Sequence, residues 1–102
     1  MALEINTTTD KDVTTVAATG EVDVSCAAEL RDAIHAALDE AKAVTIDLAE
    51  VPYIDSTGIG VLVGASHRAA EEGVALRVVN PQRNVRRVFD MLGVTDELGI
   101  DA

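Results

Sequence analysis

Patterns typical of β-strands and of α-helices alternate along this chain of 102 residues. β-branched and alternating apolar residues run from Leu3 to Thr19 around a turn at residues 10–12, which predicts a β-hairpin. Helix, strand, helix, strand and helix patterns follow, in that order, at residues 26–42, 44–48, 57–72, 74–79 and 85–92. This order predicts one small α/β layer structure, with a mixed sheet, an antiparallel N-terminal hairpin and at least one parallel crossover pair.

Residues at the ends of these segments support the same division. Pro52 ends the central strand after Val51, because proline cannot continue a strand ladder. The first helix is expected to be capped near Ser25. Gly73 and Gly93 stand where glycine commonly terminates a helix. The tail that follows is short and acidic.

Composition restricts the classes of ligand. Tyr53 and Phe89 are the only aromatic residues, so the core must be aliphatic and bases or sugars have no stacking platform. A net charge of -10 would repel nucleic acid and favours a basic protein partner. Cys26 is the only cysteine, the first residues lack a signal-peptide pattern, and no apolar stretch could span a bilayer. A cytoplasmic protein is therefore expected.

The turn before the second helix carries a candidate site. Asp55, Ser56 and Thr57 come between the central strand and the helix pattern, so Ser56 should be exposed at a helix N-terminus. Unsatisfied amides and the helix dipole favour a phosphate there, which makes Ser56 a candidate phosphorylation switch. The alternative is that the three residues act only as helix caps. A second loop, residues 20–23, also joins a strand to a helix, and the two loops could share one edge of the sheet.

Other polar residues do not form a recognisable catalytic or metal site. His35 and His67 lack ligand-spaced neighbours, and no cofactor, metal or small-molecule ligand is expected. The sequence contains no readable nucleophile–base–acid set and no complete phosphate-cradling loop, so we expect no enzymatic activity. Three arginines, Arg83, Arg86 and Arg87, are interpreted as a solvated face of the last helix.

Three motifs in order resemble the anti-sigma factor antagonists, the bacterial STAS-domain family: residues 20–23 (GEVD), 55–62 (DSTGIGVL) and 88–93 (VFDMLG). The resemblance covers most of the chain and implies a single STAS domain over residues 1–102, with a mixed sheet of four to five strands. Family members commonly continue through a further strand and a final helix, so elements after about residue 94 are expected to be shortened or absent.

The resemblance also implies a function. In that family the unmodified antagonist binds a kinase-type anti-sigma factor and so releases the sigma factor. The anti-sigma factor uses ATP to phosphorylate the serine that follows the motif aspartate, here Ser56, and this modification abolishes binding. A serine phosphatase acting on phospho-Ser56 is the further partner implied.

The remaining site residues each have two interpretations. Asp55 orients the loop or helps to remove the Ser56 proton, and Thr57 is a second phosphoacceptor or a cap. Gly58 and Gly60 allow close approach of a partner backbone or avoid crowding at the helix start. Asp23 contacts a basic partner residue or caps the helix that begins near Ser25.

Two other functions compete with the antagonist. One is a STAS accessory subunit of a lipid ABC transport system, in which the same edge binds a transporter ATPase and Ser56 stays unmodified. The other is a receiver or flavodoxin-like domain. A receiver needs an acidic pair, a central aspartate and a later lysine, and Asp47 lacks that company; flavin would require aromatic stacking.

Overall fold

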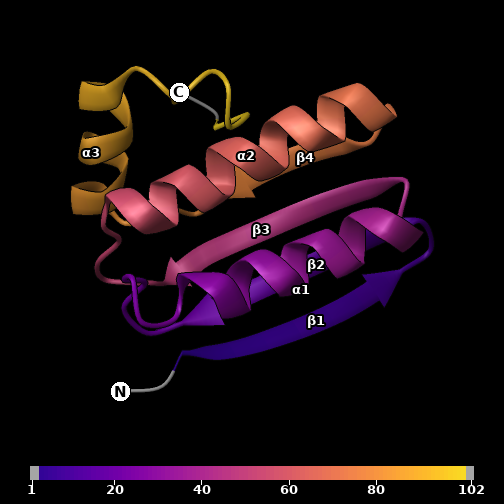
Figure 1. Cartoon of the computed structure of the whole chain (residues 1–102), viewed down its shortest axis with the longest axis horizontal. Coiled ribbons are helices and arrows are strands. Elements are labelled where there is room, and N and C mark those ends of the chain that lie inside the picture. Colours follow the sequence, from indigo (N-terminus) through magenta and orange to yellow (C-terminus); the bar gives the residue numbers. More distant parts are fainter. Residues whose placement is uncertain (1–2, 101–102) are drawn as a thin grey trace.

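The computed structural model describes residues 3–100 and contains a four-stranded sheet with three helices (Figure 1). The strands lie in the order β1-β2-β3-β4. Their bounds are Glu4–Asp10, Val13–Thr19, Ala43–Glu50 and Ala75–Val79. The helices are α1 (Ala27–Glu40), α2 (Ser56–Glu72) and α3 (Arg83–Leu92). The predicted domain ends, Met1 and Ala102, lie outside the described residues.

The sheet is mixed, as the sequence pattern predicts. β1 and β2 form the antiparallel hairpin, whereas β3 pairs parallel with both β2 and β4. Each parallel connection needs a crossover, and α1 and α2 supply the two crossovers. Figure 1 shows both helices side by side on the same face of the sheet, with their N-termini at the same end of the molecule.

The core is aliphatic apart from one aromatic ring. Inward-facing residues of β2 and β3, such as Val16 and Ile46, are fully buried beneath α1 and α2, where Leu30 and Leu62 lie. Phe89 of α3 is also fully buried and supplies the only aromatic side chain of this cluster within residues 3–100. Alternation along the strands and four-residue spacing along the helices produce these two facing layers.

The ends of the helices follow the predicted chemistry with one difference. Gly73 and Gly93 both have left-handed backbone conformations, with φ of 72° and 71°, and terminate α2 and α3 as expected. The N-cap residue of α1 is Cys26, one residue after Ser25, and it makes no side-chain capping bond. Ser25 does not cap the helix because its hydroxyl and its amide both donate to the Asp23 carboxylate.

The tail after α3 packs against the sheet. No fifth strand follows α3 within residues 3–100, so the sheet has the smaller of the two predicted sizes. Leu98 and Ile100 are nevertheless buried, and the Val78 amide donates to the Leu98 carbonyl at 3.0 Å. The Ser66 hydroxyl of α2 donates to the Glu97 carbonyl at 2.7 Å. The acidic tail therefore completes the core at the outer edge of β4.

None of the helices within residues 3–100 is long and apolar enough to cross a membrane.

Candidate functional site

Two loops meet at the carboxyl edge of the sheet. The Val22 amide donates to the Tyr53 carbonyl at 2.9 Å, and the Asp55 amide donates to the Val22 carbonyl at 3.0 Å. The Gly20 amide also donates to the Glu50 carbonyl at 3.0 Å. These bonds confirm that the loops before α1 and α2 share one edge. Residues far apart in the sequence thereby form one surface.

Asp55 organises the start of α2. Its backbone is extended, and its carboxylate accepts a hydrogen bond from the Gly58 amide at 3.0 Å. Its carbonyl accepts the first helical bond, from the Ile59 amide, also at 3.0 Å. Asp55 is therefore the N-cap residue, and α2 begins at Ser56, one residue earlier than the sequence pattern predicts. This geometry favours the orienting role of Asp55.

Ser56 and Thr57 are exposed on the first turn of α2. Within residues 3–100 the Ser56 hydroxyl forms no hydrogen bond, so it is not required as a cap. Amides in the first turn of a helix lack intrahelical acceptors and carry the positive end of the helix dipole. A phosphate on Ser56 would lie where these amides can stabilise it.

Asp23 supplies a fixed negative charge on the neighbouring loop. Its carboxylate accepts hydrogen bonds from the Ser25 hydroxyl and, at 2.9 Å, from the Ser25 amide. These bonds, the hydroxyl first, lower the pKa of Asp23 below its ordinary value because they favour the charged form. The carboxylate does not reach the first amides of α1. The Asp23 side chain therefore stabilises the local turn at Ser25 and does not cap α1. Its carboxylate remains partly exposed.

Each loop also exposes an apolar side chain that is not among the site residues predicted from the sequence. Val24 is 75% exposed beside Asp23, and Tyr53 is 48% exposed shortly before Ser56. Val24 stands between the polar residues Asp23 and Ser25, and this position was the available signal for it. We call these residues together with Asp23, Ser56 and Thr57 the Ser56 surface. It combines carboxylate, hydroxyl and apolar groups, a composition suited to a protein partner.

The two glycines near Ser56 occupy different environments. Gly58 is buried, and a Cβ atom there would lie 2.6 Å from Val22 Cγ1 and 2.7 Å from Ile54 Cγ1. Gly60 is exposed, and a Cβ atom there would have nothing within 4 Å. The structure therefore favours avoidance of crowding for Gly58. It leaves Gly60 as the glycine accessible to a partner backbone.

These environments predict opposite effects of two matched substitutions. Gly58→Ala should destabilise the fold by about 1–3 kcal/mol, since the added methyl group overpacks the junction of the two loops. Gly60→Ala should stabilise it by about 0.5–1 kcal/mol through helix propensity. Urea unfolding monitored by circular dichroism measures both. Equal effects of the two substitutions would contradict the close packing at Gly58.

Side chains at the start of α3 hold the segment that enters the site. The Gln82 side-chain amide donates to the Ala49 carbonyl at 3.0 Å. The Asn84 side-chain amide donates to the Pro52 carbonyl at 2.7 Å. The carbonyls of Ala49 and Pro52, which precede the turn at Ser56, thus accept hydrogen bonds from side chains at the start of α3.

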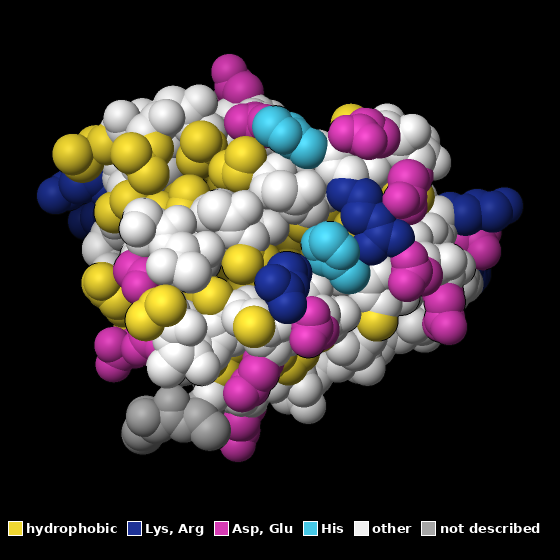
Figure 2. All heavy atoms as spheres, in the orientation of Figure 1, with side chains coloured by type: hydrophobic (Ala, Val, Ile, Leu, Met, Phe, Trp, Pro, Cys, Tyr) yellow, Lys and Arg dark blue, Asp and Glu magenta, His cyan; other side chains and the backbone are white. Residues whose placement is uncertain are grey.

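Figure 2 shows hydrophobic side chains gathered at the end of the molecule where α3 lies, with charged side chains spread over α1 and α2.

Few side chains among the described residues could bind a metal ion or act as a nucleophile. No three His, Cys, Asp or Glu side chains within residues 3–100 come together in a metal-binding group. His67 pairs with Glu97 of the tail. Cys26 is buried, and its thiol donates to the Glu21 carbonyl at 3.3 Å within the loop before α1. These groups serve local structure.

A family model for the STAS domain matches residues 4–102. The chain belongs to the STAS domain family. Known relatives place it among the anti-sigma factor antagonists of that family. It is 35% identical over 83 residues to the anti-sigma-B factor antagonist of Bacillus subtilis strain 168, covering 81% of this chain and 76% of the relative. It is 31% identical over 102 residues to that of Staphylococcus epidermidis, covering 99% and 94%.

Solved structures support the same STAS fold. An anti-sigma factor antagonist from Mycobacterium paratuberculosis superposes with a TM-score of 0.87 at 25% identity, covering 97% of this chain and 85% of that chain. SpoIIAA in its unphosphorylated form gives 0.79 at 18% identity, covering 99% and 89%. The same protein has been solved in its phosphorylated form, with a TM-score of 0.74. The family assignment decides against a receiver or flavodoxin-like domain.

Proposed function

We propose that this STAS domain is a partner-switching anti-sigma factor antagonist. In its unmodified form it binds a kinase-type anti-sigma factor and so releases the sigma factor. Phosphorylation of Ser56 abolishes that binding, and a serine phosphatase restores it. The observation that supports this most directly is the exposed Ser56 hydroxyl, free of hydrogen bonds within residues 3–100, on a surface built by two bonded loops.

The proposed switch is electrostatic and local. A phosphate adds about 1.5 to 2 negative charges. It would join two carboxylates, Asp23 on the adjoining loop and Asp55 before the helix, on an already acidic protein. A partner that closes over Ser56 would have to desolvate this charge, and any acidic group of the partner that faces the phosphate would repel it. The first amides of α2 would stabilise the phosphate, so binding is lost without refolding.

The chain contributes the acceptor and the docking surface, and we assign the chemistry to its partners. ATP binding and phosphoryl transfer belong to the anti-sigma factor, and phosphate removal belongs to the phosphatase. Val24 and Tyr53 would supply apolar contacts to the partner, and Asp23 would meet a basic residue. Under this proposal the protein has no catalytic activity and acts in the cytoplasm.

Mass spectrometry on the protein from its native cells tests the proposal. We expect one phosphate on Ser56, absent from Ser56→Ala and retained in the matched control Thr57→Ala. A kinase-type anti-sigma factor should co-purify with the unmodified form only. A phosphate on Ser56→Ala protein would move the site to Thr57. No phosphate under any condition, together with a bound transporter ATPase, would contradict the antagonist and support a lipid-transport subunit.

A further inference from the structure

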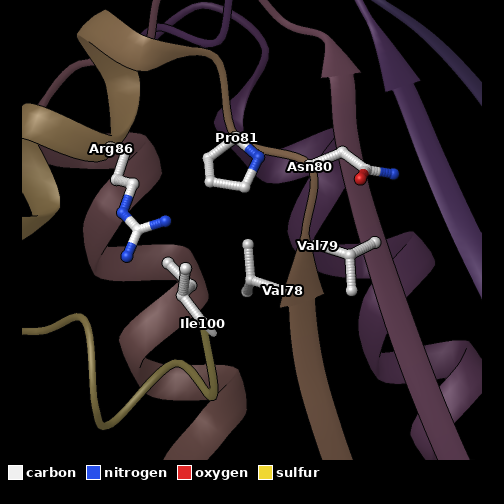
Figure 3. Close-up of a pocket in the computed structure, with 6 residues that line it drawn as sticks. All are labelled: Val78, Val79, Asn80, Pro81, Arg86 and Ile100. Carbon is white, nitrogen blue, oxygen red and sulfur yellow. The ribbon is translucent and has the colours of Figure 1, made fainter. Parts of the chain in front are cut away.

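A cavity of about 340 Å³ lies at the carboxyl end of β4, between the start of α3 and the tail (Figure 3). Its lining residues are Val78, Val79, Asn80, Pro81, Arg86 and Ile100. The carboxyl edge of a parallel sheet is the usual position for ligands in α/β proteins. The volume is at the small end of the range for ligand pockets. A ligand of modest size would fit.

The wall of the cavity combines apolar side chains with polar groups, among them one cationic side chain. Figure 3 shows the side chains of Val78, Pro81 and Ile100 directed toward the cavity, with the Arg86 guanidinium entering from α3. The side chain of Asn80 points away, and its amide donates to the Asp47 carboxylate at 3.3 Å. The polar side chain available inside is therefore Arg86.

Arg86 differs from the other cations of the chain. Among the lysines and arginines of residues 3–100, only Arg68 and Arg86 are half-buried. Arg68 is bound by the carboxylates of Asp39 and Glu72, which raise its pKa. Arg86 has no carboxylate partner within residues 3–100, although the chain holds 18 acidic and 8 basic residues. Partial burial of an unpaired charge is costly, so the guanidinium is poised to accept an anion.

We propose that this cavity binds a small aliphatic carboxylate. The planar guanidinium of Arg86 matches a carboxylate, which it can bind through two parallel hydrogen bonds. The aliphatic chain of the ligand would lie against Val78, Pro81 and Ile100 and remove apolar surface from water. Arg86 is half-buried at this cavity, so it does not belong to the solvated face that the sequence predicts for the last helix. Arg83 and Arg87 are exposed and do match that prediction.

Titration of ¹⁵N-labelled protein with hexanoate, followed by NMR, tests this site. Saturable shifts are expected at the amides of residues 78–80, 86 and 100. Arg86→Gln should weaken the affinity by about tenfold or more, the usual effect of losing charge-assisted hydrogen bonds. The matched control Arg87→Gln removes an exposed charge from the next position and should leave the affinity unchanged.

Two further probes separate the parts of the ligand. Hexanamide keeps the aliphatic chain without the charge, and inorganic phosphate keeps a charge without the chain; both should bind much more weakly than hexanoate. These two comparisons use the unaltered protein, so they hold even if Arg86→Gln fails to fold. The proposal is overturned if hexanoate gives no saturable shifts at millimolar concentration. It is also overturned if phosphate binds as well as hexanoate, or if both arginine variants lose binding equally.

Discussion

Replacing Ser56 with aspartate is expected to weaken binding of the anti-sigma factor by about 100-fold, or about 2.7 kcal/mol. The added carboxylate stands for part of the phosphate charge, and a charge desolvated without a partner in an interface commonly costs this much or more. Ser56→Ala should bind within about threefold of the unaltered protein, because Ser56 forms no hydrogen bond within residues 3–100 that the substitution could break. Calorimetric titration with the co-purifying anti-sigma factor measures the three affinities.

Ser56→Asn is the matched control for this prediction. Asparagine has nearly the size of aspartate but no charge, so a charge-based switch requires Ser56→Asn to bind much more tightly than Ser56→Asp. Equal losses for both would show that the interface rejects bulk, not charge. Thermal unfolding adds an internal check. A negative charge on the first turn of α2 interacts favourably with the positive end of the helix dipole, so Ser56→Asp should not lower the melting temperature.

Replacing Leu98 with alanine is expected to destabilise the protein by about 2–5 kcal/mol. Leu98 is fully buried in the tail, and its removal would leave a cavity beside the outer edge of β4. Leu92 at the end of α3 is 57% exposed, so the matched substitution Leu92→Ala should cost less than about 0.5 kcal/mol. Unfolding in urea measures both differences.

The contrast between the two leucines tests whether the tail belongs to the core. A small effect at Leu98 would mean that residues 94–100 do not contribute to folding. A large effect at Leu92 would instead indicate that its exposed side chain packs against another molecule. Native-state hydrogen exchange at the Val78 amide offers a second readout, because this amide donates to the Leu98 carbonyl. Its protection should fall in Leu98→Ala and remain in Leu92→Ala.

The sequence by itself determined the order of the elements and the chemistry of the Ser56 turn. Alternating apolar residues in the strands and the helical spacing from Leu30 to Leu38 are local signals. Such signals depend only on residues close together in the chain, so they can be recognised from the sequence alone. The N-cap role of Asp55 and the left-handed glycine at Gly73 are equally local, because each depends on neighbours within one helical turn. These features therefore carried over into the fold with shifts of one or two residues at their ends.

Only the tertiary structure decided which distant residues meet. The bonds between Val22 and the Ser56 turn depend on how β2 and β3 pair, and spacing along the chain does not contain that register. The same contact makes Gly58 a packing residue. Burial of Leu98 in a short acidic tail likewise depends on the open edge of β4, and Arg86 shares its cavity with Ile100 of that tail. Contacts between separate elements set these environments, so no local pattern could predict them.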